Sequence, residues 1–231
     1  MNDRFNERSF LVPDTEKRLF HLLASMGIMF GGQIQAHQIL HRVSKTARKI
    51  LAKLKSEHKV VEHTLTAGGK EYKLYTLGPV GAAIINVPYQ QDYWFWYSDS
   101  EAIQKLMSVD LYIQMCDYLS AEVKVLVANR PYAHTFVHGD REYQIGVVLD
   151  DVVSLLELYR WEPPRERVIL ICQRVNQVDS LLGYLGDQNP VRIVTREKLK
   201  EGLIFYKPEN GKWTLDVPDK GIKSNKVKLK E

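Results

Sequence analysis

The spacing of apolar residues changes midway through the stretch from residue 44 to residue 75. In its first half, apolar residues recur at intervals of three and four, at Ala47, Ile50, Leu51 and Leu54. This spacing is typical of one buried face of a helix, and Ser44 is suited to cap that helix. In the second half, residues 60–65 and 72–75 alternate like strands on either side of the turn signal at 68–69. The pattern predicts a helix followed directly by a hairpin.

Two further helices are predicted before this stretch. Residues 16–26 have helical spacing behind Pro13, and a short helix containing Ile39 and Leu40 follows the glycine pair at 31–32. Three helices followed by a two-stranded hairpin are the element order of a winged helix-turn-helix. We therefore predict a winged helix over residues 13–82.

In the second half of the chain, the spacing of apolar residues changes more than once. A long helix with its apolar residues near one face is predicted over 100–119. Three strands are predicted next, over 122–128, 133–137 and 143–149, and then a helix over 150–159 capped by Asp150 or Asp151. Continuous apolar strands alternate with helices after that, as strand 167–172, helix 175–185, strand 191–195 and helix 196–201. The elements predict an α+β chain whose second half is an α/β domain with a mixed central sheet.

These elements divide the chain into five predicted parts. The winged helix at 13–82 is joined to the α/β domain at 100–218 by a linker at 83–99 that is rich in aromatic residues. Bases can stack on exposed rings, but rings this dense are typical of a contact between domains or subunits, which we expect here. The polar residues 1–12 are expected to be flexible, and the basic tail at 219–231 is expected to be disordered.

The formal net charge of +4 is unevenly distributed along the chain. Residues 40–80 carry a net +6 and residues 220–231 a net +4, whereas residues 81–219 carry −6. A basic head and tail on an acidic body favour a localised surface for a polyanion over an evenly solvated charged face. Because the basic segment coincides with the predicted helix and hairpin, double-stranded DNA is the expected partner.

The candidate DNA-binding residues lie just before the basic helix, in its first turns and near the hairpin tip: Arg42, Ser44, Lys45, Thr46, Arg48, Lys49, Lys53, Thr64, Thr66 and Lys70. Arg48 is the best candidate for reading bases, because a guanidinium can bond guanine O6 and N7 together. Lys45, Lys49 and Lys53 are expected on phosphates, and Lys70 on the adjacent backbone or minor groove. With about four to six phosphate contacts, the logarithm of affinity should fall with the logarithm of salt at a slope of roughly −4 to −5.

Other chemistry finds little support in the sequence. No HExxH motif, Cys–His metal spacing or phosphate loop occurs, so no catalytic residue, metal or cofactor is predicted. Cys116 and Cys172 lie on separate apolar segments and predict two buried thiols, not a disulfide. His134 and His138 are four residues apart on a strand, which is poor geometry for a metal pair. Without a signal peptide or a run of about 18 apolar residues, a cytoplasmic protein away from membranes is expected.

The sequence resembles the replication-relaxation family of bacterial plasmids and mobile elements. The resemblance extends over about residues 14–207 and rests on ARKILAKLKSEHKVVEHTLTAGGKEYKLYTLGPVG in the first half. In the second half it rests on RPYAHTFVHGDREYQIGVVLDD, RVILICQ and VRIVTREKLKEG. The resemblance implies a winged helix joined to a domain similar to the PD-(D/E)xK nucleases of the restriction-endonuclease type.

The catalytic pattern of that nuclease fold is missing from this sequence. Such a site needs a carboxylate at the start of one strand and Glu-x-Lys or Asp-x-Lys on the next, to bind Mg²⁺. Tyr132 stands where the first carboxylate is expected, and residues 144–148 contain neither a carboxylate nor a following Lys. Carboxylates at strand ends offer an alternative cluster, although turn and cap roles also account for them: Asp140, Glu142, Asp150 and Asp151. We expect a degenerate PD-(D/E)xK fold without catalytic residues.

These observations predict a sequence-selective, double-stranded DNA-binding protein of a plasmid or mobile element. It would regulate transcription or act as an accessory factor in replication or copy-number control. A homodimer is expected because one winged helix buries little surface on DNA, with residues 89–97 or the helix at 101–119 as the contact. The alternatives are a metal-dependent nuclease or nickase with a rearranged carboxylate site, and a winged helix that binds protein.

Overall fold

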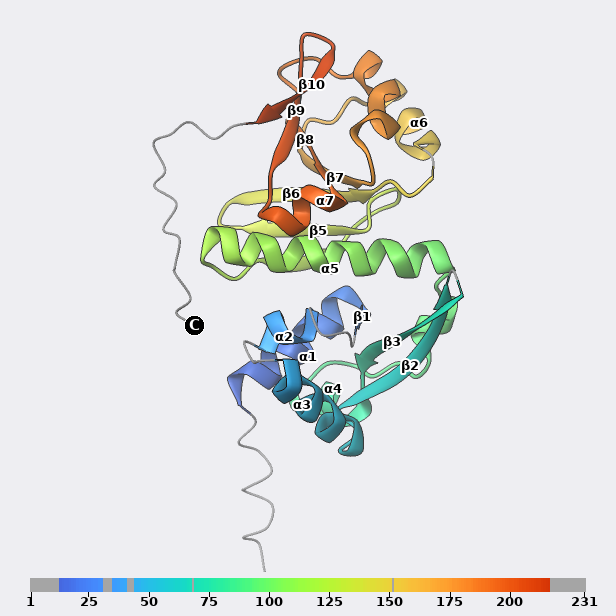
Figure 1. Ribbon diagram of the computed structural model, residues 1–231, viewed down its shortest axis with the longest axis vertical. Helices are drawn as coiled ribbons and strands as arrows, with labels where there is room; N and C mark the ends of the chain where they lie inside the picture. Colours follow the sequence, from blue (N-terminus) through green and yellow to red (C-terminus); the bar gives the residue numbers. More distant parts are fainter. Residues whose placement is uncertain (1–12, 31–34, 41–43, 68, 151, 217–231) are drawn as a thin grey trace, which may run out of the picture.

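The computed structural model describes residues 13–30, 35–40, 44–67, 69–150 and 152–216. Within these ranges the fold is α+β, with a three-stranded sheet, a seven-stranded mixed sheet and helices packed on both. The long helix α5 (Asp99–Leu119) crosses the middle of the molecule, with the small sheet on one side of it and the large sheet on the other (Figure 1). The predicted flexible N-terminus and basic tail lie outside the described residues.

An N-terminal unit is formed by α1 (Asp14–Met26), β1 (Met29–Phe30), α2 (Gln35–Leu40), α3 (Ser44–Ser56), β2 (Val60–Ala67) and β3 (Lys70–Leu77). Its strands lie in the order β1-β3-β2 and are antiparallel. The predicted helices and the hairpin are confirmed, although both strands of the hairpin are longer than the alternation indicated. Strand β1 was not predicted, because two residues are too short to show a period.

A short helix, α4 (Pro79–Ile84), completes the N-terminal unit and was not predicted. Pro79 occupies its first turn, where a missing N–H leaves no hydrogen bond unmade. Gly81 allows α4 to approach the corner between α3 and β2, since a Cβ there would lie 2.3 Å from the carbonyl oxygen of Lys59. The helix therefore closes the unit at the point where the basic helix turns into the hairpin.

The large sheet consists of β4 (Lys124–Val127), β5 (His134–His138), β6 (Arg141–Val147), β7 (Arg167–Cys172), β8 (Val191–Thr195), β9 (Phe205–Glu209) and β10 (Lys212–Asp216). These strands lie in the order β10-β9-β8-β7-β6-β5-β4, with β6, β7 and β8 parallel and the other pairs antiparallel. The predicted mixed sheet is confirmed, and β7 and β8 have the predicted bounds. The β9–β10 hairpin was not predicted.

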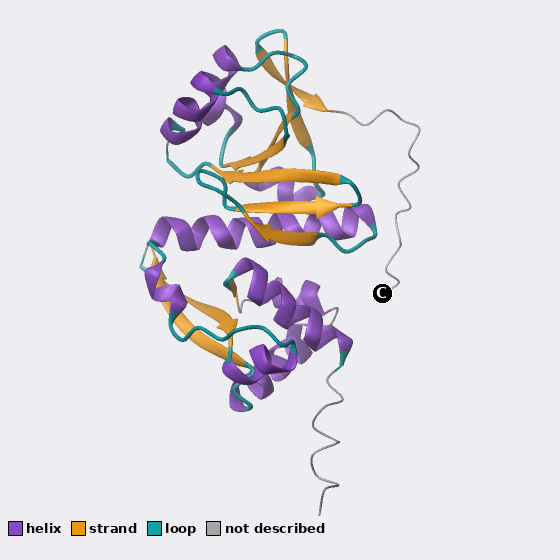
Figure 2. Ribbon diagram, turned by 180° about the vertical axis from the view of Figure 1, so that it is seen from behind, coloured by secondary structure: helices purple, strands orange, loops and turns teal. Residues whose placement is uncertain are grey.

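Helices cover both faces of this sheet. Val168, Leu170 and Cys172 of β7 pack with α6 (Val153–Trp161) and the 3₁₀ helix η4 (Val175–Tyr184). Ile169 and Ile171 face the opposite way, into the cluster that contains α5 and α7 (Arg196–Glu201). Figure 2 shows α6 and η4 separated from α5 by the sheet. Successive residues of β7 are buried on opposite faces of the sheet, which explains why the sequence of this strand is a continuous apolar run.

The start of α6 differs from the prediction. Its N-cap is Val152, which has no capping side-chain hydrogen bond, so Asp150 does not cap the helix. Asp151 lies outside the described residues. The segment predicted as a helix at 175–185 forms η4, whose tighter turns end at Tyr184.

Helix α5 is apolar on more than one face, contrary to the prediction. Toward the large sheet, the ring of Tyr112 meets Phe136 edge-on, with centroids 6.0 Å apart. Toward the N-terminal unit, Leu106 packs with Ile28 and Leu74. A single cluster of buried residues includes α1, α5 and the large sheet, so the core continues through α5. Helix α5, one of the two predicted dimer contacts, therefore packs on both sides within its own chain.

The aromatic linker packs back onto the N-terminal unit. Tyr93, in a short 3₁₀ turn (Tyr93–Trp96), donates its hydroxyl to the carbonyl oxygen of Gly27 at the end of α1. The ring of Trp94 lies 4.2 Å from that of His63 on β2. Phe95 and Trp96 point outward and are 66% and 82% exposed. The linker is thus a contact within the chain that also presents two rings to solvent.

The structure also describes the two cysteines and the apolar character of the helices. Cys172 is buried and Cys116 is half-buried, and both are free thiols. Burial raises the pKa of Cys172 to about 12, so this thiol stays protonated at neutral pH. Among the helices that the structure describes, none combines the length and apolar character needed to cross a bilayer.

Candidate nucleic-acid interface

The basic helix α3 has one buried face and one cationic face. Ala47, Leu51 and Leu54 are almost fully buried in the core of the N-terminal unit. Arg48 and Lys49 lie on the opposite side and are exposed. The apolar spacing of the sequence dictates this orientation, since residues three and four apart share a face of a helix. Two cations in the first half of α3 therefore project into solvent.

The cations of α3 differ in how far carboxylates neutralise them. Lys53 Nζ lies 3.8 Å from Glu57, one turn later, and Lys55 Nζ lies 2.8 Å from Glu62 on β2. Arg48 and Lys49 make no ion pair within the described part of the chain. The uncompensated positive charge is therefore concentrated at Arg48 and Lys49, nearer the start of the helix.

The β2–β3 hairpin has one covered face and one open face. Cross-strand pairing places Thr64 opposite Lys73 and Thr66 opposite Glu71, on the face that also carries Glu62. The alternate residues, His63 among them, pack against the aromatic linker and α5. Because Lys55 of α3 reaches Glu62, the open face lies on the same side as α3. Figure 1 shows the hairpin running from the end of α3 toward the start of α5.

Glu62 joins α3 to both strands of the hairpin. Its carboxylate accepts hydrogen bonds from Lys55 at 2.8 Å, from the hydroxyl of Tyr75 at 2.6 Å and from Lys73 at 3.4 Å. These hydrogen bonds lower the pKa of Glu62 from 4.5 to about 2, and the bond from Lys55 has the largest effect. Burial opposes the shift. Burial and the bond to Glu62 raise the pKa of Tyr75. The network holds the hairpin at a fixed angle to α3.

Replacing Glu62 by Gln should lower the free energy of unfolding by about 1–3 kcal/mol at pH 7, because charge-assisted hydrogen bonds are lost. The pKa of Glu62 is lowered in the folded state, so its contribution is complete above its unfolded pKa of about 4.5 and is lost as pH falls toward 2. Urea unfolding of both proteins at pH 7, 4 and 2.5 measures this. A difference that does not shrink with falling pH would contradict the ionic role.

The predicted DNA-binding residues fall into three groups in the structure. Four are exposed on α3 or on the open face of the hairpin, as expected: Arg48, Lys49, Thr64 and Thr66. Lys53 is exposed but pairs with Glu57, and Thr46 is half-buried. Arg42 lies outside the described residues, and the side chains of Ser44, Lys45 and Lys70 lie outside the described part.

Lys73 belongs to this surface and was missed. It stands opposite Thr64 on the open face and is exposed. Counting outward from the turn at residues 68–69 gives this pairing, so the hairpin register was a signal that could have found it.

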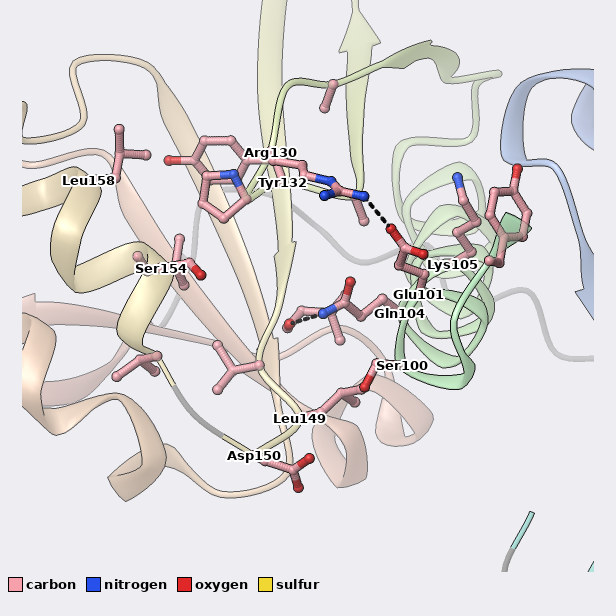
Figure 3. Close-up of a pocket in the computed structure, with 18 of the residues that line it drawn as sticks. Ser100, Glu101, Gln104, Lys105, Arg130, Tyr132, Leu149, Asp150, Ser154 and Leu158 are labelled. Atoms are coloured by element: carbon pink, nitrogen blue, oxygen red, sulfur yellow. Dashed lines mark hydrogen bonds and ion pairs between the residues drawn. The ribbon is translucent and has the colours of Figure 1, made fainter. Parts of the chain in front are cut away.

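A pocket lies at the place expected for a nuclease centre (Figure 3), and the carboxylates among its lining residues are Glu101, Asp150 and Glu157. Tyr132 lines it, and its hydroxyl pairs with that of Tyr159 at 3.2 Å. Asp140 and Glu142 lie at the start of β6, whereas Asp150 follows its end, so the alternative cluster is split by a whole strand. In the described ranges, no three His, Cys, Asp or Glu side chains are grouped to hold a metal.

His134 lies deep in the interior. Burial, together with the positive charge of Lys105, lowers its pKa to about 3, so the ring is neutral at physiological pH. His138 is half-buried at the other end of β5. The ring centroids of His134 and Phe136 lie 6.3 Å apart, so His134 is a packing residue in the core between β5 and α5.

No protein-family model, curated protein or solved structure matches this chain. We therefore infer its function from the sequence and structure of this chain.

Proposed function

We propose that this protein binds double-stranded DNA through α3 and the open face of the β2–β3 hairpin, as a sequence-selective regulator or replication accessory factor of a plasmid or mobile element. The order α1, β1, α2, α3, β2, β3 supports a winged helix-turn-helix, in which α3 enters the major groove. The order α5, β4, β5, β6, α6, β7 is compatible with a PD-(D/E)xK-like fold that lacks catalytic residues. Both agree with a member of the replication-relaxation family.

One observation carries this proposal. Arg48 and Lys49 are exposed and unpaired within the described residues, on a helix whose other face is locked in the core. A rigid helix that presents free cations beside a hairpin matches the geometry with which such proteins read a groove and hold the adjacent backbone. Arg48 can bond a guanine through two donors, and Lys49 can neutralise a phosphate.

The hairpin contributes backbone contacts in this arrangement. Thr64 and Thr66 can donate hydroxyl hydrogen bonds to phosphate oxygens, and Lys73 adds a cation on the same face. Glu62 keeps Lys73 and Lys55 partly neutralised before DNA arrives. Phosphates would have to compete with this carboxylate, so the hairpin contributes less to affinity than its lysine content suggests.

A second copy would supply a second α3 to the same operator, since one head buries too little surface for strong specificity. The exposed rings of Phe95 and Trp96 support the linker as the contact between copies, because α5 is covered within the chain. Light scattering of the protein with and without an operator fragment measures this, and a monomer in both states would exclude it.

Selection of bound fragments from the host's genomic and plasmid DNA tests the proposal directly. We expect a small set of fragments with a shared motif to be enriched by the full chain. A variant with Arg48→Ala and Lys49→Glu, carried through the same selection, should enrich none of them. Equal enrichment by both proteins would place DNA binding elsewhere on the molecule.

The affinity for a selected fragment should depend steeply on salt. Arg48 and Lys49 alone would give a log–log slope of about −2 per head, and engagement of Lys53 and Lys73 would bring it to about −4. Fluorescence anisotropy between 50 and 300 mM salt (a range of about sixfold) measures the slope. A slope near zero would mean that phosphates are not neutralised by these residues.

Replacing Glu62 by Gln should raise the affinity for the same fragment by about three- to tenfold at low salt, since it frees Lys55 and Lys73 for phosphates. The same substitution lowers stability, so the two effects have opposite signs. Anisotropy at 10 °C, where the variant remains folded, separates them. A loss of affinity would show that Glu62 serves DNA binding by shaping the hairpin, not by restraining its cations.

A further inference from the structure

A cavity of about 730 Å³ lies beside α5, apart from the α3 surface. Its walls come from the first turns of α5, the loop between β4 and β5, the end of β6 and the helix α6. Figure 3 shows side chains from these elements pointing toward a common space. This volume falls in the range of about 300–1,000 Å³ that is typical of small-molecule sites.

The cavity has two cations and one carboxylate at one end, namely Arg130, Lys105 and Glu101, and the carboxylate of Asp150 at the other. Arg130 is 91% exposed at its side chain, and its guanidinium lies 2.8 Å from Glu101. Lys105 lies on the same side, with its Nζ 4.8 Å from the ring centroid of Tyr97. Asp150 lies at the opposite end in Figure 3, with Gln104 between them. The cavity is therefore polarised along its length.

The carboxylate at the far end has no cation of its own. Asp150 is exposed and makes no ion pair within the described ranges. At the other end, Arg130 has donors left after bonding one carboxylate, since a guanidinium carries five N–H groups. The wall also has an apolar part, which includes Val148, Val152 and Leu155, all buried.

We propose that this cavity binds a small dipolar ligand with a carboxylate and an ammonium group at the two ends of an apolar chain, and that binding alters the DNA affinity of α3. The ligand carboxylate bonds Arg130, and the ammonium group pairs with Asp150. The apolar part of the ligand lies against Val148, Val152 and Leu155. Amino acids with separated charges and short peptides belong to this class. The effect on DNA rests on the proposed function, whereas binding itself does not.

The first turns of α5 connect the cavity to the N-terminal unit. Glu101, Gln104 and Lys105 face the cavity, whereas Ala102 and Leu106 pack with Ile28 in the core of the N-terminal unit.

Two further contacts reach the same unit. Tyr97 lines the cavity, and its hydroxyl oxygen packs closely against Gly27. A Cβ atom added to Gly27 would lie only 2.7 Å from that oxygen. Gln35 at the start of α2 donates to the carbonyl oxygen of Leu106 at 3.0 Å. A shift of this part of α5 on ligand binding would therefore move α1 and α2, against which α3 packs.

Titration calorimetry of the full chain with 6-aminohexanoate tests the binding step. Hexylamine and hexanoate are the controls, because each keeps the same chain and only one of the two charges. We expect 6-aminohexanoate to bind at least tenfold more tightly than either control. Equal affinities for the three compounds, or no binding of any, would overturn the proposal.

A variant with Asp150→Asn should bind 6-aminohexanoate at least tenfold more weakly. Its matched control is Asp140→Asn, which removes one exposed carboxylate at the other end of β6. This control should bind like the unaltered protein. Loss of binding in the control, or none in the cavity variant, would overturn the assignment.

The effect on DNA is measured with a selected fragment at saturating 6-aminohexanoate. We expect the dissociation constant to change at least threefold, and to remain unchanged in the cavity variant. Ligand binding with an unaltered DNA affinity would overturn the coupling. If the protein binds the ligand but no DNA at all, the proposed function fails while the cavity assignment stands.

Discussion

Replacing Arg48 by Ala together with Lys49 by Glu should weaken binding to a selected DNA fragment by at least about 100-fold at low salt. Each side chain is expected to contribute about 1–3 kcal/mol, through a guanine or a phosphate, and 1.4 kcal/mol corresponds to a factor of ten. The change also places a negative charge against the DNA backbone. Anisotropy with a labelled fragment measures the loss, and the salt slope should become shallower by about two.

A variant of equal charge change serves as the control. Arg165→Ala with Lys212→Glu alters two exposed cations, one ahead of β7 and one at the start of β10, in the half of the molecule that lies across α5 from α3. This variant should bind within about twofold of the unaltered protein. Circular dichroism of both variants checks that the fold is kept. Equal losses in the two would mean that net charge, and not the α3 surface, determines binding.

The N-terminal elements could be predicted because their signals are local. The apolar spacing from Ala47 to Leu54 fixes the buried face of α3, and the glycine pair at 68–69 marks the hairpin turn. The same reasoning found β7 and β8 as continuous apolar strands. It also found α5 within one residue of its bounds, but it missed that Ala102, Val109 and Ile113 are buried as well as the face that was predicted. A helix covered on both sides has no single apolar face to detect.

The electrostatics of the interface could not be predicted in the same way. Sequence gives the number of cations on α3, but the pairing of Lys55 with Glu62 depends on how α3 packs against β2. Lys53 was predicted as a phosphate contact, and its neighbour Glu57 shares its charge in the structure. Asp150 was considered as a helix cap and lies instead at the end of a cavity. In each case the missing information is a contact set by tertiary packing.

The continuity of the core through α5 predicts how the molecule unfolds. Leu111 is fully buried on α5, in the cluster that reaches from α1 to the large sheet. Replacing it by Ala should lower the free energy of unfolding by about 2–5 kcal/mol, through lost burial and a residual cavity. The N-terminal unit and the large sheet should still unfold in one step, since one cluster of buried residues runs through this helix into both. Urea unfolding followed by circular dichroism and by tryptophan fluorescence should give coincident curves.

Tyr118→Ala is the matched control, because this residue lies on the same helix but is 55% exposed. It should cost less than about 1 kcal/mol, as surface substitutions do. Two transitions, of which Leu111→Ala shifts only one, would show that the units at 13–82 and 100–218 have independent cores. Their relative orientation would then be free to vary on DNA. A single transition instead shows that α3 and the large sheet belong to one cooperative unit, as expected if two copies joined through the linker hold their α3 helices at one defined spacing.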